Sequence, residues 1–524
     1  MLKSRFKKVT VIAAVSAVAA LLAGCAQNLN AMDNYAPAMN SSMVEYDVQA
    51  SGGNMDMEQP QGWNTEEYSA IKESGFKNPR TEPLSTFSAD VDTASYTNIR
   101  RYINNGEGVP EGAVRIEEML NYFSYDYPEP EEGKAFSTSV EMGDCPWNEN
   151  TKLLKIGLQT KKIDTSEMPP SNLVFLIDSS GSMNSYDKLP LIKKAFALVT
   201  ENMGENDRIS IVTYAASNKT LIDGATVNDK DRIMDELSTL VAYGSTNGEG
   251  GIQAAYEVAE RNFIEGGINR VILATDGDLN VGITSESELK KLIEEKRESG
   301  ISLSVIGVGT GNIKDNKMET LADNGNGNCS YIDSITEAER VLIEEKGATF
   351  FTVAKDVKFQ LEFNPEAVKG YRLIGYENRA LDNADFADDT KDAGELGAGH
   401  SVTVLYEVAL TGSEQEVAEY ELEFSETGGT GSTDICKIST RYKPIDSEES
   451  VLEETIVPAS VMDKSVSEDF RFTSAVAEFG MILRDSEYKG TSTFDSVLEL
   501  AANSGNSSEK REFAALVEKA RKIY

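Results

Sequence analysis

Histidine and cysteine are scarce in this chain of 524 residues, which has one histidine, His400, and four cysteines. A zinc site made of cysteine and histidine ligands needs several such residues close together, so the sequence excludes it. If Cys25 carries lipid, as argued below, then Cys145, Cys329 and Cys436 remain. This odd, widely spaced set specifies no disulfide framework. We therefore expect the fold to depend on its hydrophobic cores.

Positive charge is also in short supply. The chain has 50 Lys and Arg residues against 87 Asp and Glu residues, and its formal net charge is −37. Such an excess of carboxylates repels phosphate backbones and anionic lipid headgroups, whereas it favours divalent cations and basic partners. The composition therefore argues against nucleic acid binding.

Long apolar runs are missing after the first residues of the chain. Residues 9–24 are apolar, but a transmembrane helix needs ~20 such residues. The run follows four basic residues and ends on Leu-Ala-Gly-Cys at 22–25, which resembles the lipobox of bacterial lipoproteins. The resemblance implies a signal peptide at 1–24, an acylated Cys25, and an exported protein anchored by lipid to the bacterial cell membrane or envelope surface. The alternative is a plain signal peptide with an incidental cysteine.

The length is sufficient for two or three domains with separate cores. Residues 25–80 are mostly small and polar at their start, which is typical of a flexible tether. We predict four parts after the signal peptide: the tether at 25–80, an N-terminal flanking domain at 81–165, a central domain at 170–346, and a C-terminal β-rich domain with terminal helices at 347–524.

The central part alternates apolar strands with amphipathic helices. This alternation predicts an α/β fold in which a mainly parallel sheet has helices on both faces. The expected strands are 173–177, 208–214, 270–275 and 301–308, and the expected helices are 188–203, 229–241, 250–263, 286–298 and 337–345. Ligands of such sheets bind at the carboxyl ends of the strands.

Each flank of the central part is short of strands on its own. We therefore expect antiparallel pairing between the flanks, with the central domain inserted between two halves of one β unit. The expected strands are 136–142 and 153–160 before the central part, and 357–363, 371–376, 401–409, 419–424 and 435–442 after it. The expected helices are 93–104, 113–123, 467–483, 494–502 and 510–523.

Polar side chains follow two of the central strands. Asp178, Ser180 and Ser182 come directly after the first strand, and Asp276 follows the strand at 270–275. Thr246 adds a hydroxyl from a Gly-Ser-Thr loop that precedes a helix. Carboxylate and hydroxyl oxygens are hard ligands, so this set favours Mg²⁺, with Mn²⁺ or Ca²⁺ as alternatives.

The pattern Asp-x-Ser-x-Ser, a Gly-Ser-Thr loop and a late Thr-Asp-Gly resembles the metal-ion-dependent adhesion site of von Willebrand factor A domains. The resemblance implies a Rossmann-like A domain in which Asp178, Ser180, Ser182, Thr246 and Asp276 hold one divalent cation. Residues 87–92 and 394–400 also look like the surroundings of the A domain in bacterial lipoproteins. The cation would be left incompletely neutralised, so an acidic side chain of a protein partner could complete its coordination.

Single residues of these motifs also have simpler interpretations. Asp178 alone could cap a helix, and Ser182 alone could be a turn residue. Asp187 and Asp278 are expected to be solvated loop carboxylates. The acidic run 382–392 could hold calcium, but it lacks the alternation of an EF-hand and is expected to be a solvated loop. His400 is expected to be structural.

Three function classes follow. The first is a divalent-cation-dependent binding module on the cell surface. The second is a scaffold subunit of a membrane-associated envelope assembly in which the flanking domains recognise the partner. The third, a hydrolase, is disfavoured: a subtilisin-like triad needs a histidine near Asp178, an aspartyl-phosphate enzyme needs a carboxylate where Ser180 stands, and no phosphate-binding Gly-Lys-Ser/Thr loop occurs. The sequence therefore predicts a protein that is not an enzyme.

Overall fold

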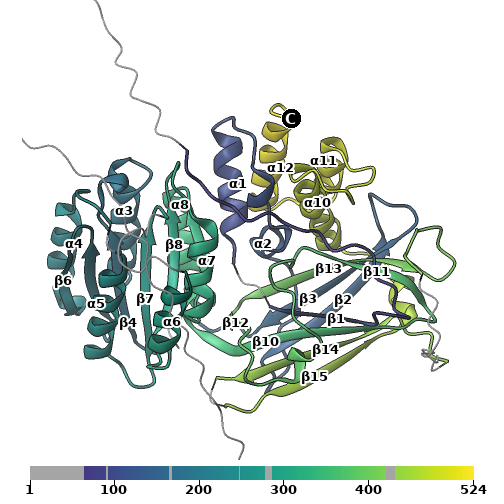
Figure 1. Ribbon diagram of the computed structural model, residues 1–524, viewed down its shortest axis with the longest axis horizontal. Coiled ribbons are helices and arrows are strands. Elements are labelled where there is room, and N and C mark those ends of the chain that lie inside the picture. Colours follow the sequence, from purple (N-terminus) through teal and green to yellow (C-terminus); the bar gives the residue numbers. More distant parts are fainter. Residues whose placement is uncertain are drawn as a thin grey trace, which may run out of the picture. The chain divides into compact units, whose positions relative to one another are not determined.

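A six-stranded sheet forms the centre of the chain in the computed structural model (Figure 1). The structure describes residues 64–89, 92–164, 168–246, 248–277, 286–419, 431–445 and 447–524. The strand order is β6-β5-β4-β7-β8-β9, with all neighbours parallel except β5 and β6. The strands are β4 Ser171–Asp178, β5 Arg208–Tyr214, β6 Asn218–Ala225, β7 Ile268–Thr275, β8 Ser302–Val308 and β9 Cys329–Ile332.

Helices cover both faces of this sheet because β4 is apolar on both sides. Phe175 and Ile177 point into a core with α3 and α4, whereas Val174 and Leu176 join α5, α6 and α7 in a second core. The helices are α3 Leu189–Glu201, α4 Lys230–Thr239, α5 Gly248–Arg261, α6 Glu286–Arg297, α7 Asp315–Asn324, α8 Ile335–Glu339 and α9 Lys346–Phe350. A mainly parallel sheet with helices on both faces is the α/β arrangement that the sequence predicted.

The flanks form two antiparallel sheets that pack face to face. One has the order β1-β10-β14-β15, with β12 also paired to β10, and the other has the order β11-β13-β3-β2. The strands are β1 Leu84–Ser88, β2 Phe136–Asp144, β3 Lys152–Thr160, β10 Thr352–Phe363, β11 Val368–Ile374, β12 Gly394–Gly397, β13 Ser401–Leu410, β14 Cys436–Pro444 and β15 Val451–Val457. Aromatic and aliphatic side chains of both sheets form one core between them.

Strands from before and after the A domain pair in both sheets. In one, Phe87 of β1 lies opposite Phe359 of β10, and in the other, Lys155 of β3 lies opposite Leu405 of β13. The predicted insertion of the A domain between two halves of a β unit is therefore confirmed.

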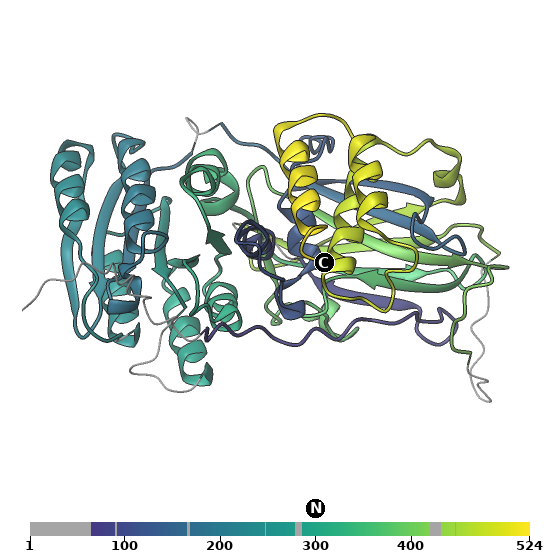
Figure 2. The same cartoon turned by 90° about the horizontal axis from the view of Figure 1, so that it is seen from above.

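Five helices form a further hydrophobic cluster on the sandwich. They are α1 Ala94–Asn104, α2 Ile116–Asn121, α10 Glu468–Leu483, α11 Phe494–Ala502 and α12 Ser508–Ala520. Figure 2 shows the three C-terminal helices, in yellow, lying together against the sandwich. Each of them begins at a hydroxyl side chain that accepts the backbone N–H of the third helical residue, namely Ser467, Thr493 and Ser507.

Most of the expected elements are present with small shifts at their ends. The structure adds β1, β6, β9, β12, β15, α7 and α9, which the sequence pattern did not indicate. The strand expected at 419–424 falls almost wholly outside the described residues. Cys145, Cys329 and Cys436 are buried and free, which agrees with a fold that depends on its cores. In the part of the chain that the structure describes, no helix is long and apolar enough to span a membrane.

Candidate metal site

Two aspartates lie side by side where neighbouring parallel strands end. Asp178 is the last residue of β4 and Asp276 follows β7, and the two strands are paired with Ile177 opposite Ala274. Both side chains are buried, with exposures of 0% for Asp178 and 1% for Asp276. Burying two carboxylates together is unfavourable unless a positive charge accompanies them.

The turn after β4 directs two hydroxyl groups toward each other. The backbone N–H of Ser180 donates to Oδ1 of Asp178 at 2.9 Å, and the Oγ atoms of Ser180 and Ser182 lie 2.9 Å apart. The N–H of Gly181 donates to the carbonyl of Gly244 at 2.9 Å, which joins this turn to the loop that carries Thr246.

Thr246 lies in a loop that is hydrogen-bonded to the same turn. The N–H of Tyr243 donates to the carbonyl of Ser179 at 2.7 Å. Gly244 has φ +90°, a left-handed conformation that favours glycine, and Thr246 is buried just before α5 begins. The structure thus brings all five predicted residues to one edge of the sheet. It links Asp178, Ser180 and Ser182 by side-chain contacts, and it links Thr246 through its loop.

A lysine already pairs with one of the two aspartates. Nζ of Lys188 lies 2.8 Å from Oδ2 of Asp276, and the lysine side chain is only 8% exposed. Its stem passes over Gly309, where an added Cβ would lie 2.2 Å from Cγ of Lys188. Gly309 has φ +76°, so a glycine suits this position in both backbone and space.

Among the residues that the structure describes, Asp178 accepts hydrogen bonds but pairs with no cation. Burial raises its pKa to about 6, although hydrogen bonds from Ser180 and Thr275 oppose this shift. The Oγ1 of Thr275 donates to Oδ2 of Asp178 at 3.2 Å and also accepts the N–H of Gly277 at 3.1 Å. The environment therefore holds the Asp178 carboxylate in a fixed orientation while leaving its charge uncompensated.

These residues fit a small divalent cation. Adjacent ligands of an octahedral Mg²⁺ with metal–oxygen distances of ~2.1 Å lie about 3 Å apart, close to the 2.9 Å between the two serine Oγ atoms. Two carboxylates and three hydroxyls are oxygen donors, the type that Mg²⁺ prefers. In the described segments, no three His, Cys, Asp or Glu side chains gather as a metal cluster.

Sequence reasoning missed two residues of this site. Lys188 was counted as the start of a helix, and Thr275 as the end of a strand. The Thr-Asp-Gly motif contains Thr275, so its hydroxyl was visible in the sequence. Nothing local indicated Lys188, because its partner lies 88 positions later in the chain. Asp187, expected to be a solvated carboxylate, is half-buried and accepts a hydrogen bond from Oγ of Ser185.

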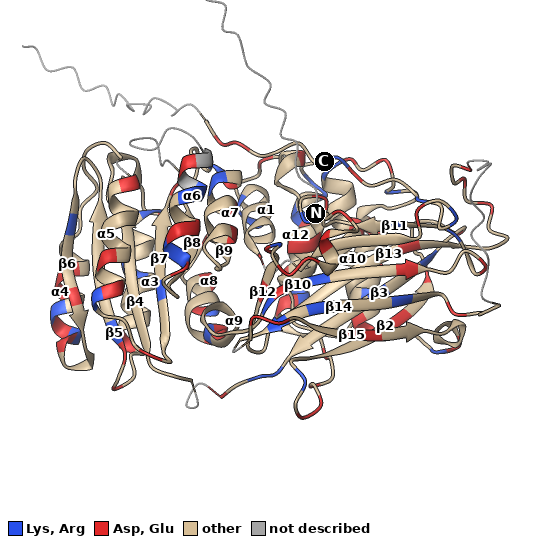
Figure 3. Ribbon diagram, turned by 60° about the horizontal axis from the view of Figure 1, so that its bottom comes forward, with Lys and Arg blue, Asp and Glu red and all other residues tan. Residues whose placement is uncertain are grey.

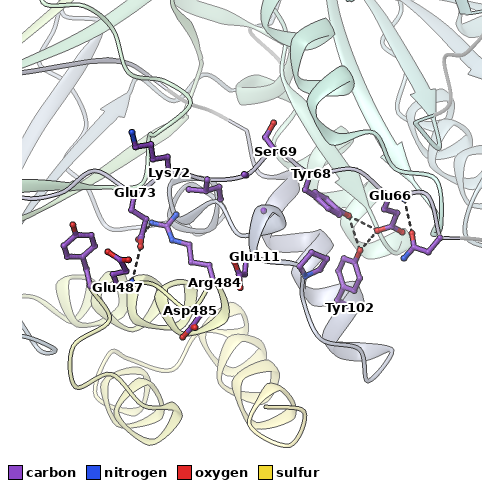
Figure 4. A pocket seen from close by; sticks show the side chains of 16 residues that line it. Glu66, Tyr68, Ser69, Lys72, Glu73, Tyr102, Glu111, Arg484, Asp485 and Glu487 are labelled. Atoms are coloured by element: carbon purple, nitrogen blue, oxygen red, sulfur yellow. Dashed lines mark hydrogen bonds and ion pairs between the residues drawn. The ribbon is translucent and has the colours of Figure 1, made fainter.

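A hollow of about 1000 Å³ lies elsewhere, between residues 64–73, α1 and the segment after α10 (Figure 4). Its acidic lining is largely engaged in existing pairs. Glu66 contacts Arg101 and Tyr102, and Glu73 lies 2.6 Å from Nη2 of Arg484. These contacts attach residues 64–73 to the folded part and give no reason to place a metal there.

Comparison with known families supports the A domain. The model for the von Willebrand factor type A domain matches residues 172–343, and the model named von Willebrand factor matches residues 62–155. The model for the C-terminal part of the uncharacterized protein YfbK matches residues 348–523. Together these matches extend over the central domain and both flanks.

Individual proteins resemble this chain to different extents. The uncharacterized protein YfbK of Escherichia coli (strain K12) is 40% identical over 468 residues, which are 87% of this chain and 81% of that protein. A von Willebrand factor type A structure from Catenulispora acidiphila has 12% identity and a TM-score of 0.42, and the match covers 73% of this chain and 89% of that one. Proximal thread matrix protein 1 from the mussel byssus, solved with zinc in its MIDAS motif, has 20% identity, a TM-score of 0.28, and coverages of 34% and 45%.

Proposed function

Since the chain belongs to the family of the protein YfbK of Escherichia coli, we propose a function for its von Willebrand factor type A domain. The domain binds one divalent cation, Mg²⁺ in the first place, through Asp178, Ser180, Ser182, Thr246 and Asp276. The bound cation captures an acidic side chain of a protein partner. The chain acts as a binding or adhesion module and not as an enzyme.

One observation carries this proposal: two buried aspartates meet at the carboxyl edge of the sheet, beside two serine hydroxyls that lie 2.9 Å apart. Aspartates that are buried this deeply need positive charge nearby. Lys188 supplies it to Asp276, and a cation would supply it to Asp178.

The charges explain why an acidic partner is expected. Two carboxylates and the ammonium group of Lys188 leave one negative charge in excess at the site. A divalent cation changes this to one positive charge in excess. An incoming carboxylate restores neutrality and fills a coordination position at the same time. Its attraction to the cation is stronger in a partly buried site than in water.

The position of His400 argues against a hydrolase with a Ser-His-Asp triad at Asp178. It is the single histidine of the chain and lies between β12 and β13 of the sandwich, whereas Asp178 ends β4 of the A domain. A Ser-His-Asp triad requires these groups within hydrogen-bond distance. The proposal therefore assigns Asp178 to metal binding.

The anchor is part of the same proposal. Cys25 falls outside the described residues, so its assignment rests on the sequence resemblance to a lipobox and on the basic and apolar residues before it. Acylation at Cys25 would place the A domain at the envelope surface, where an exported partner is accessible. The domain boundaries given under Sequence analysis stay predictions.

Capture of a partner from envelope extracts tests the proposal. The full chain should retain a partner in Mg²⁺ and release it in EDTA, and Asp178→Ala should retain none. Asp187→Ala is the matched control, because Asp187 lies in the same loop but points to Ser185, and it should behave as the wild type. Capture that survives both EDTA and Asp178→Ala would favour the scaffold alternative, in which the flanking domains recognise the partner.

A further inference from the structure

Two tyrosines and a valine are unusually exposed at the edge of the candidate metal site. Tyr186 is 87% exposed, Tyr243 is 81% exposed and Val241 is 73% exposed. They are the most exposed large hydrophobic side chains of the part of the chain that the structure describes. When a partner covers side chains of this kind, their apolar surface is removed from water, so their presence on two loops beside the same site indicates a contact surface.

Both tyrosines belong to the loops that carry the candidate ligands. Tyr186 lies two residues before Lys188, whose ammonium group contacts Asp276. Tyr243 precedes Gly244, whose carbonyl accepts the N–H of Gly181 in the turn after β4. The N–H of Tyr243 donates to the carbonyl of Ser179, and the N–H of Lys188 donates to the carbonyl of Ser185 in the turn that contains Tyr186. Both tyrosine side chains extend into solvent.

The loops that carry these tyrosines are poor in charge. The loops at 179–188 and 240–246 contain Asp187 and Lys188 as their charged residues, in a chain of which 26% of residues are charged. At the same edge of the sheet, the loop at 309–313 packs against a segment that carries Glu66 and Glu67. Lys188 is buried against Asp276. Asp and Glu residues, shown in red on the ribbon in Figure 3, are spread along the helices and the sandwich. Charge depletion together with exposed tyrosine is typical of the centre of a protein interface.

We propose that Tyr186, Tyr243 and Val241 form a docking rim for a protein segment in which one acidic residue is flanked by apolar side chains. The acidic residue reaches the cation, and its apolar neighbours pack on the rim. This inference rests on the proposed metal-dependent function and adds the chemistry of the partner. Segments with several acidic residues fit poorly, because the whole chain carries a net charge of −37 and repels them.

A random dodecapeptide phage library provides the test. The full chain is immobilised in Mg²⁺ and bound phage are eluted with EDTA. We expect the enriched peptides to share a single Asp or Glu with apolar neighbours. Made synthetically, these peptides should bind the Tyr186→Ser/Tyr243→Ser double variant at least tenfold more weakly than the wild type. Both tyrosines are exposed, so the double variant is expected to fold normally.

The control is Ile456→Ser, which removes a side chain that is 54% exposed on β15 of the sandwich, and it should leave peptide affinity unchanged. The inference is overturned if the enriched peptides contain acidic runs, if they bind the double variant as tightly as the wild type, or if EDTA elutes no enriched peptide. Metal-dependent binding to a glycan array without any peptide binding would also overturn it.

Calorimetric titration with Mg²⁺ alone distinguishes failure of the proposed docking rim from failure of the proposed metal-dependent function. The wild type and the double variant should both take up the ion, and Asp178→Ala should not. If the ion is taken up but the peptide results contradict the rim, then only the docking inference is wrong. If the wild type takes up no ion, then the metal-dependent function itself is wrong.

Discussion

Glu478 in α10 is a buried carboxylate whose ionisation should destabilise the protein at neutral and alkaline pH. Its side chain is completely buried. Oε2 accepts a hydrogen bond from Oγ of Ser496 at 2.8 Å, whereas Oε1 has no hydrogen-bond partner among the described residues. Burial raises the pKa of Glu478 from 4.5 to about 7, and the hydrogen bond from Ser496 only partly opposes this.

The sign of the pH dependence follows from this raised pKa. The folded protein holds the Glu478 proton more tightly than the unfolded chain does. Between pH 4.5 and 7 the unfolded chain therefore loses its proton first, and stability falls as the pH rises. Above pH 7 the full cost is present, and a difference from 4.5 to about 7 corresponds to about 3 kcal/mol.

Glu478→Gln keeps the shape of the side chain and removes the charge. Relative to the wild type, the variant should gain about 2.5 kcal/mol of stability between pH 5 and pH 8. In the variant, the amide group at the Oε1 position also lacks a hydrogen-bond partner, which lowers stability by the same amount at both pH values. The quantity to compare is therefore how the stability difference between variant and wild type changes with pH. Urea denaturation followed by the fluorescence of Trp147, which is buried in the same cluster as α10, measures it.

Glu499→Gln is the matched control for this experiment. Glu499 lies on the neighbouring helix α11 and is exposed, so its substitution should give the same stability difference at both pH values. Parallel pH profiles for the wild type and Glu478→Gln would refute the reasoning, because they would mean that Glu478 is ionised at no cost in the folded protein.

Three further substitutions have expected outcomes. Lys188→Met keeps the buried stem but removes the ammonium group, so calorimetry should show Mg²⁺ binding at least tenfold tighter, since the ion no longer meets a positive charge. Gly277→Ala should destabilise the protein by about 1–3 kcal/mol in thermal unfolding, because φ is +101° and the new Cβ would lie 2.5 Å from a backbone nitrogen. Arg372→Met should cost about 3–5 kcal/mol in urea denaturation, since it leaves Glu407 buried, at 1% exposure, without its ion-pair partner at 2.8 Å.

Each of these outcomes has a contrary result. Unchanged or weaker Mg²⁺ binding in Lys188→Met would mean that the lysine charge does not oppose the ion. Gly266→Ala serves as the control for Gly277, because Gly266 also has a positive φ of +67° but has open space around it. Equal losses for the two glycine variants would show that the backbone conformation, and not the close approach, sets the cost. A loss below 1 kcal/mol for Arg372→Met would mean that Glu407 does not depend on the arginine.

The sequence predicted the fold well for strands whose burial in the sheet leaves a clear hydrophobic pattern. β4 is apolar on both faces and lies in the middle of a sheet, so its residues show an unbroken apolar run. β6 was missed because it is an edge strand whose first three residues are exposed and polar. β9 was missed because it has only four residues. Short strands and strands at sheet edges bury too little to leave a clear pattern.

The candidate site was predicted from a motif, and the structure places its five residues at one edge of the sheet. Metal binding by these residues stays a prediction. Lys188 could not be found from the sequence, because its role depends on the distance between the loop after β4 and the end of β7, and on the space above Gly309. The exposure of Tyr186 and Tyr243 likewise depends on how their loops are held. Tertiary contacts of single polar side chains leave no periodic pattern.

Calorimetric titration of the full chain with Mg²⁺ tests the central claim most directly. The wild type should take up one ion per chain, and Asp178→Ala, which removes the buried carboxylate at the end of β4, should take up none. Failure of the wild type to bind Mg²⁺, Mn²⁺ or Ca²⁺, or equal binding by the variant, would contradict the account.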